Sequence, residues 1–360
     1  MYKLECHLMG HQDTILCLAM SRSGQLLASR GMDGLRIWNI EKKKPLSKLA
    51  QLQNPGDLVT LITWVTHKGD LQEGLCCSTG LGYLTIWRQH PNEYYDFKEV
   101  TSKKISVGTK VTAVNADICD RTRDQQVQVW SLNSKYQLYN IFSIELPTIV
   151  PWALFFQEGR GVIVFRMYNS KDGMQLGSKG TGMMIGAASV DPSHKFLVID
   201  NATIGFSLHC MGDATCVKTY DTKPQKTYPQ QVTFAERGRV IVGRSDNGIV
   251  YIFNKTTGDL LQLLQHSKSD FLWDTLTMPY LAAQTYNAAD HYLVAAASSS
   301  NDHNNTITIW KKSIKPGPGN RTWVMIQTAL QMAMQCLAIA IVEVILYCTM
   351  VRHRSYGVLF

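Results

Sequence analysis

The chain has 360 residues, enough for one large closed domain or two ordinary ones, and 45% of them are hydrophobic, so it can build a packed core. Lysine and arginine outnumber aspartate and glutamate by 36 to 28, which gives a net charge of +8. The basic residues are scattered rather than gathered into a stripe with interleaved aromatic residues, and this disfavours a nucleic-acid-binding protein.

The nine cysteines indicate neither a disulfide scaffold nor a zinc site. Their number is odd and no CxxC pair occurs. Several lie in apolar runs, such as Cys17 in ILCLAM, where a buried free thiol in a reducing compartment is expected. The first residues, MYKLECHLMGHQD, are too polar for a secretory signal.

The start of the chain predicts an antiparallel sheet. Apolar or alternating runs at 14–21, 25–30 and 35–40 are separated by turn residues, and this pattern predicts three short strands. A fourth strand is expected at 46–52, after a turn that contains Lys42 to Lys44.

The third of these strands recurs along the chain. Its equivalents end in LTIW, VQVW and ITIW, with weaker matches between them, and the recurring position is held by Trp38, Trp87, Trp130, Tyr168, Leu208, Phe253 and Trp310. The steps run from 38 to 57 residues, which is the spacing of four-stranded propeller blades. The sequence therefore predicts an all-β, seven-bladed β-propeller of four-stranded antiparallel blades over residues 1–312, with residues 2–8 closing the last blade.

Blade one resembles a WD repeat. It has Gly10-His11 before the first strand, Ser29 in the second, Asp33-Gly34 in the next turn and Trp38-Asn39 at the end of the third. Asn39 stands where the family usually has Asp. Blade six keeps Asp246 in its turn but has Phe253-Asn254 at the Trp-Asp position, and blades four and five match only in strand pattern.

The resemblance implies that His11, Ser29, Asp33 and Trp38 form a hydrogen-bonded chain. A buried carboxylate needs such partners, since an unpaired one costs several kcal/mol. Only blade one has all four residue types, so the other blades must depend on apolar packing between neighbours. We expect uneven stability around the ring, with blades four and five the least stable.

The end of the chain has a different composition. Residues 313–322 form a basic Pro/Gly linker, 323–351 are predicted to be one hydrophobic helix about 40 Å long, and 352–360 are a short tail. Such a helix exceeds the hydrocarbon core of a membrane, about 30 Å thick, so a transmembrane span is predicted. Its polar side chains are Gln327, Gln331, Gln335 and Glu343, and the three glutamines share one face.

Loop charges predict the orientation of that span. Four basic residues precede it, Lys311, Lys312, Lys315 and Arg321, and two follow it. This places the propeller on the cytosolic side, in the layout of a tail-anchored membrane protein. In the alternative interpretation, the helix lies flat, packs on a partner or mediates self-association, and the glutamine face supports that arrangement.

No catalytic, cofactor-binding or metal-binding residues are predicted. The segment GSKGTG at 177–182 lacks the phosphate-binding loop pattern, and no HExxH or GxSxG occurs. By resemblance to the family, a protein or peptide partner would dock on the face with the His-bearing loops and the second-to-third-strand turns. Candidate residues there are Arg30, Met32, Arg121, Arg123, Asp246, Asn247 and His303.

These observations favour a non-catalytic interaction scaffold tethered to a membrane, with protein partners rather than nucleic acid or small-molecule substrates. One alternative is a soluble scaffold subunit whose C-terminal helix packs on a partner or in a dimer. Another is a propeller enzyme with a site in the central channel, formed by residues that meet only in space. A degenerate duplicate is a further interpretation, since most blades lack the Trp-Asp pair.

Overall fold

The computed structural model divides the chain into two compact units, Met1–Lys312 and Ser313–Phe360. It describes residues 1–31, 33–46, 59–65, 72–93, 96–105, 111–115, 119–122, 126–133, 135–145, 154–156, 161–163, 167–169, 174–177, 187–201, 204–224, 230–246, 248–266, 281–298, 305–314 and 334. The strands belong to the first unit, apart from the last residue of the final strand.

The described strands form seven four-stranded antiparallel sheets, numbered here in chain order. Sheet 1 contains β2 (Ile15–Met20), β3 (Leu26–Gly31), β4 (Gly34–Asn39) and β5 (Lys44–Pro45). Sheet 2 contains β6 (Val59–Val65), β7 (Gly74–Thr79), β8 (Tyr83–Gln89) and β9 (Phe97–Lys104). Sheet 3 contains β10 (Val111–Asn115), β11 (Cys119–Thr122), β12 (Gln126–Leu132) and β13 (Leu138–Glu145).

The second half of the first unit repeats this arrangement. Sheet 4 contains β14 (Leu154–Phe156), β15 (Gly161–Ile163), β16 (Met167–Asn169) and β17 (Gln175–Gly177). Sheet 5 contains β18 (Ala188–Val190), β19 (Phe196–Asn201), β20 (Gly205–Cys210) and β21 (Cys216–Asp221). Sheet 6 contains β22 (Val232–Ala235), the 3₁₀ turn η1 (Glu236–Gly238), β23 (Val240–Arg244), β24 (Ile249–Asn254) and β25 (Leu260–Gln265).

Sheet 7 joins the two ends of the first unit. Its strands are β26 (Leu281–Asn287), β27 (His291–Ser298), β28 (Thr306–Ser313) and β1 (Lys3–Met9). β1 is the outer strand, antiparallel to β28, and Tyr2 beside it exchanges two 2.8 Å hydrogen bonds with the Gln262 side chain of β25. Pairing of β1 with the last sheet covers the strand edge that the ring would otherwise expose.

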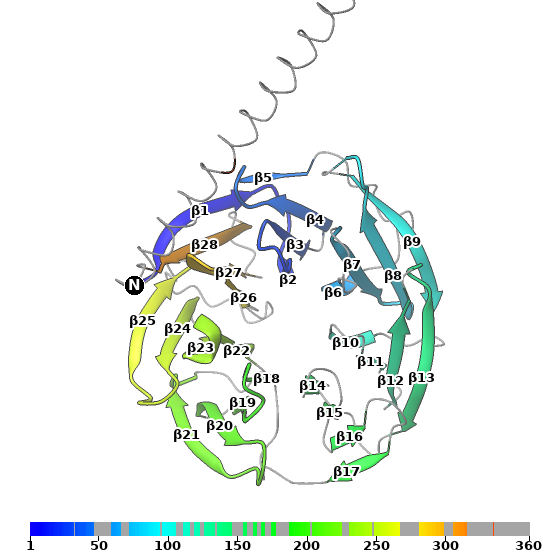
Figure 1. Ribbon diagram of the computed structural model, residues 1–360. Coiled ribbons are helices and arrows are strands. Elements are labelled where there is room, and N and C mark those ends of the chain that lie inside the picture. The colour runs from blue at the N-terminus through cyan, green and yellow to red at the C-terminus, as the bar shows by residue number, and fades with distance from the viewer. Residues whose placement is uncertain are drawn as a thin grey trace, which may run out of the picture. The chain divides into compact units, whose positions relative to one another are not determined.

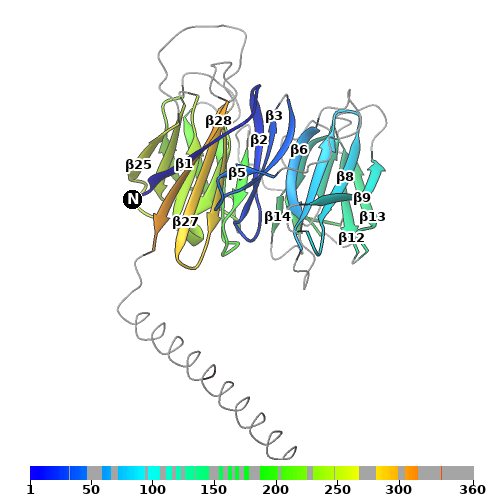
Figure 2. The same ribbon diagram turned by 90° about the horizontal axis from the view of Figure 1, so that it is seen from above.

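Together the sheets have the arrangement of a β-propeller. In Figure 1 the first strand of each sheet lies toward the centre of a ring and the last strand lies on its rim, and Figure 2 shows the same sheets from the side. Each residue of the recurring series, from Trp38 to Trp310, lies in the third strand of its sheet. The all-β architecture of four-stranded antiparallel sheets is thus the one that the repeat predicts.

The fourth strand of sheet 1 starts earlier than expected. Residues 40–43 form the turn, in which the Asn39 side chain accepts a 2.6 Å hydrogen bond from the Lys42 N–H and Lys43 has a φ of 55°. The strand therefore begins at Lys44 rather than at residue 46. Residues 47–52 of the predicted strand lie outside the described part of the chain.

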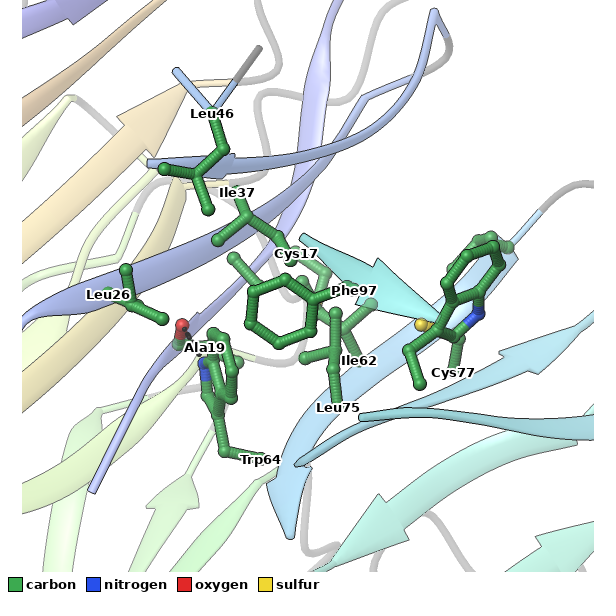
Figure 3. Close-up of a cluster of buried hydrophobic side chains, with 13 residues drawn as sticks. Cys17, Ala19, Leu26, Ile37, Leu46, Ile62, Trp64, Leu75, Cys77 and Phe97 are labelled. Carbon is green, nitrogen blue, oxygen red and sulfur yellow. Dashed lines mark hydrogen bonds between the residues drawn. The ribbon is translucent and has the colours of Figure 1, made fainter. Parts of the chain in front are cut away.

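Apolar side chains fill the spaces between neighbouring sheets. Figure 3 shows the cluster between sheets 1 and 2, where Phe97 lies edge-on to Trp64 with ring centroids 6.0 Å apart. The Trp64 indole N–H donates a 2.8 Å hydrogen bond to the Ala19 carbonyl across the sheet boundary. This cluster is the inter-sheet packing that must hold the ring together, since each sheet alone leaves its faces exposed.

Within the described ranges, no helix is both long enough and apolar enough to span a membrane. The predicted helix at 323–351, with its polar residues Gln327, Gln331, Gln335 and Glu343, lies outside those ranges except for Met334.

Candidate functional site

The four residues singled out in blade one lie in one hydrogen-bonded chain at the boundary between the His11 loop and sheet 1. His11 Nδ1 is 2.6 Å from Asp33 Oδ1, and His11 Nε2 is 2.7 Å from Ser29 Oγ. The Trp38 indole N–H donates to the same Ser29 oxygen at 2.7 Å. Asp33 also accepts hydrogen bonds from the Gln12 N–H and from Arg36, both at 2.9 Å.

The direction of the protons along this chain follows from the chemistry of its members. The Asp33 carboxylate can only accept, so the shared proton lies on His11 Nδ1, and Nε2 of the neutral ring accepts the Ser29 hydroxyl hydrogen while the Trp38 indole donates to the Ser29 oxygen. His11 therefore carries its proton on Nδ1 and donates it to Asp33. Burial lowers the pKa of His11 and outweighs the opposite effect of Asp33, which agrees with this neutral tautomer.

Glycine at position 31 leaves the space that the chain needs. A Cβ atom there would lie 2.3 Å from Asp33 Oδ1 and 2.7 Å from His11 Nδ1. No other residue fits without breaking the His11–Asp33 contact. The sequence pattern does not single out Gly31, because glycine is common where a strand runs into a turn.

Equivalent positions in other sheets carry different residue pairs. Strand register aligns Ser29 and Trp38 of sheet 1 with Cys77 and Trp87 of sheet 2. Trp87 Nε1 is buried without a hydrogen-bond partner among the described residues, because a thiol replaces the hydroxyl. In sheet 3, Trp130 Nε1 instead donates to Gln128 Oε1 at 3.1 Å. These polar residues therefore stabilise individual sheets and do not form one shared site.

Arg30 is a correction to the expected partner-binding face. The sequence predicts an exposed anchor, but the Arg30 side chain is packed inside the ring and the residue is only 7% exposed. Arg30 lies in β3 opposite Cys17 of β2, and burial lowers the pKa of its guanidinium. Arg30 is therefore mostly buried and offers a docking partner little surface.

The remaining candidates on this face are only partly described. Asp246 is half-buried at the end of β23, and Arg121 lies in β11, whose side chains are not described. Met32, Arg123, Asn247 and His303 lie outside the described residues.

Two apolar side chains project from second-to-third-strand turns on the same face. Leu81, between β7 and β8, is 54% exposed, and Ile204, between β19 and β20, is 46% exposed. The strand pattern places Leu81 in such a turn, but it does not single out Ile204. A bulky aliphatic residue at a turn tip is the signal that could have found both, because turn tips ordinarily carry polar residues or glycine.

Within the described residues, no group of three or more His, Cys, Asp or Glu side chains lies close enough to hold a metal ion.

One buried carboxyl has unusual surroundings. Asp200, at the β19 position equivalent to Ser29, is 1% exposed, and burial raises its pKa to about 7. A carboxyl with this pKa is partly protonated at neutral pH.

Comparison with known proteins supports the fold alone. No family model matches the chain, and no curated protein matches it in sequence. Among solved structures, the chain resembles the crystal structure of Saccharomyces cerevisiae Sqt1, with a TM-score of 0.62. The match covers 86% of this chain and 99% of the Sqt1 chain, at 11% sequence identity. The overall fold is therefore similar to that of a known protein, although few residues are identical.

Proposed function

We propose that this chain is a seven-bladed, WD-repeat-like β-propeller that acts as a non-catalytic platform for a protein or peptide partner. The seven described sheets, the closing strand β1 and the hydrogen-bonded chain of blade one support the blade count and the likeness to WD repeats. The fold shared with Sqt1 agrees with this architecture.

The exposed turn residues Leu81 and Ile204 are the main support for a docking face. Each of these residues leaves about half of its surface in water, and burying that apolar surface against a partner would gain free energy. The partner chemistry that fits is a protein or peptide surface with its own apolar anchor and a polar rim, as in ordinary protein interfaces.

The test is a paired substitution on this face, Leu81→Glu with Ile204→Glu, in the full-length chain. The matched control is Leu261→Glu with Leu263→Glu in β25, where two leucines of similar exposure lie on the rim strand. Proteins captured from cells by cross-linking should be lost from the face variant and retained by the control, with both variants melting near the wild-type temperature. Equal capture by the two folded variants would rule out this face.

The second part of the proposal is a membrane tether at residues 323–351, with the propeller on the cytosolic side. Its support is compositional: 29 residues with Glu343 as their one charged side chain, preceded by a basic linker. Alkaline carbonate extraction of membranes tests it, with full-length protein compared with a chain that ends at Pro318. Retention of only the full-length chain in the pellet supports the tether, and release of both forms contradicts it.

A further inference from the structure

The junction between sheets 5 and 6 is held differently at its two ends. At one end, the Asp200 carboxyl of β19 accepts a 2.6 Å hydrogen bond from the backbone N–H of Gln230, just before β22. Among the described residues, its other oxygen, Oδ1, is buried without a hydrogen-bond partner, and so are both side-chain amide atoms of Gln230. The two residues that form this contact thus carry three buried polar atoms without partners among the described residues.

At the other end of β19, a second carboxylate is fully paired. Asp191, which follows β18, forms a 2.9 Å ion pair with Lys255, which follows β24. The same carboxylate accepts hydrogen bonds from the backbone N–H and the hydroxyl of Ser193. The ammonium of Lys255 also lies 5.0 Å from the ring centre of Phe196. This end satisfies its charge, whereas the Asp200 end does not.

We propose that the junction between sheets 5 and 6 is a pH-responsive seam, which tightens when the Asp200 carboxyl is protonated and loosens when it is ionised, while the Asp191–Lys255 ion pair holds the opposite end. A protonated carboxyl keeps one oxygen as the acceptor for the Gln230 N–H and gains an O–H donor. The charge that protonation removes lies on a carboxyl that is only 1% exposed. Protonation thus removes a buried charge whose Oδ1 atom accepts no hydrogen bond among the described residues.

Among the described residues, the charged side chain that acts on Asp200 from the packed elements is Arg244 of β23. Burial raises the pKa of Asp200 more than the Gln230 N–H and Arg244 lower it, and the result is about 7. The ordinary value for an unfolded aspartate is about 3.9. The Asp200 carboxyl therefore loses its proton more readily when the junction is open than when it is closed. Because of this difference, the free energy of opening falls as the pH rises from about 4 to about 7.

Hydrogen exchange of the full-length chain measures this opening. The protection factor at the Gln230 and Arg244 amides, corrected for the intrinsic pH dependence of exchange, should fall by up to about tenfold per pH unit between pH 5 and 7. Asp200→Asn keeps the acceptor and cannot ionise, so its protection should stay constant over this range. An equal pH dependence in Asp200→Asn, or none in the wild-type chain, would overturn the proposal.

Asp191→Asn is the matched control at the opposite end. Burial acts to raise the pKa of Asp191, but hydrogen bonds from Ser193 and Lys255 and the charge of Lys255 lower it below its ordinary value. We expect Asp191→Asn to lower protection at every pH from 5 to 7 and to leave the slope unchanged. If Asp200→Asn fails to fold, ¹³C NMR of the wild-type aspartate carboxyls replaces it. A midpoint near 7 for Asp200 supports the seam, and one below 5 overturns it.

Discussion

The indole N–H of Trp38 donates a 2.7 Å hydrogen bond to the hydroxyl of Ser29, one strand away in sheet 1. The same two positions hold Trp87 and Cys77 in sheet 2, and Phe253 and Gly243 in sheet 6. In sheet 2 the acceptor is replaced by a thiol, and the Trp87 indole N–H has no partner among the described residues. In sheet 6 both the donor and the acceptor are replaced. The pair therefore takes three different forms within one ring.

Cys77→Ser should stabilise the protein. A serine hydroxyl at this position gives Trp87 Nε1 the acceptor that Trp38 has in sheet 1, and a satisfied buried donor is worth about 1 kcal/mol. Urea unfolding should show a higher midpoint with an unchanged slope. Ser29→Cys is the reciprocal control, expected to destabilise by at least as much. An unchanged or lower midpoint for Cys77→Ser would contradict the assignment of the unpaired indole.

Gly243→Ala should destabilise, although the glycine occupies the position of Ser29. A Cβ atom there would lie 2.0 Å from Cε2 of Phe206 in sheet 5. Phe206 is fully buried and cannot move aside without disturbing the packing, so overpacking of about 1–3 kcal/mol is expected. Thermal unfolding measures the loss, and Gly243→Ala with Phe206→Leu should recover part of it. A stable single variant would show that Phe206 has room to shift.

The repeat is readable from the sequence because its signal is local. Trp38, Trp87 and Trp310 each end a short apolar run. A period near 40 residues can be recognised without knowing which segments contact one another in the fold. The hydrogen-bonded chain of blade one is predictable for a different reason, namely that all four residue types lie within 28 positions of one another in the familiar order.

Features that depend on contacts between sheets are not readable in the same way. Arg30 resembles a turn residue, but β3 continues to Gly31 and carries it into the interior. Asp191 and Lys255 are 64 positions apart, and nothing in either segment indicates that one faces the other. Ion pairs of this kind depend on how neighbouring sheets pack, which a strand pattern does not encode.

Asp33→Asn should destabilise the chain most at neutral pH. Burial acts to raise the pKa of Asp33, but hydrogen bonds from the Gln12 N–H, His11 and Arg36 lower it below its ordinary value. A lowered carboxyl pKa stabilises the fold above about pH 4, and that stabilisation is lost as the pH falls through the folded value. Asparagine also presents an amide NH₂ group to the Gln12 N–H. We expect a loss of about 2 kcal/mol at pH 7.

The pH dependence distinguishes this effect from a simple packing defect. Urea unfolding between pH 7 and pH 3 should give converging curves for the wild-type chain and Asp33→Asn, because the wild type loses the contribution of the carboxylate in acid. A difference between the two that stays constant down to pH 3 would show that the carboxylate charge contributes nothing. Asp13→Asn, at an exposed aspartate in the same loop, is the control.

Lys312→Met should weaken the closing sheet of the ring. Lys312 of β28 forms a 2.6 Å ion pair with Glu236 of the β22–β23 turn, so it joins sheet 7 to sheet 6. The Glu236 side chain is almost wholly buried, while Arg239 reaches it from the solvent side at 3.5 Å. Removal of the lysine leaves a buried carboxylate that has lost its shortest ion pair, with Arg239 at 3.5 Å and the Tyr2 hydroxyl as its remaining neighbours, and such a loss costs about 3 kcal/mol.

A double-mutant cycle separates the pair from its surroundings. Glu236→Gln alone should also destabilise the protein, because Lys312 then loses its negatively charged partner. The double variant should be more stable than the sum of the two single losses predicts. Chemical unfolding of the four proteins gives the coupling free energy, expected at about 1 kcal/mol or more. Additive losses would mean that Arg239 alone compensates Glu236, and that the closure of sheet 7 depends on β1 and apolar packing.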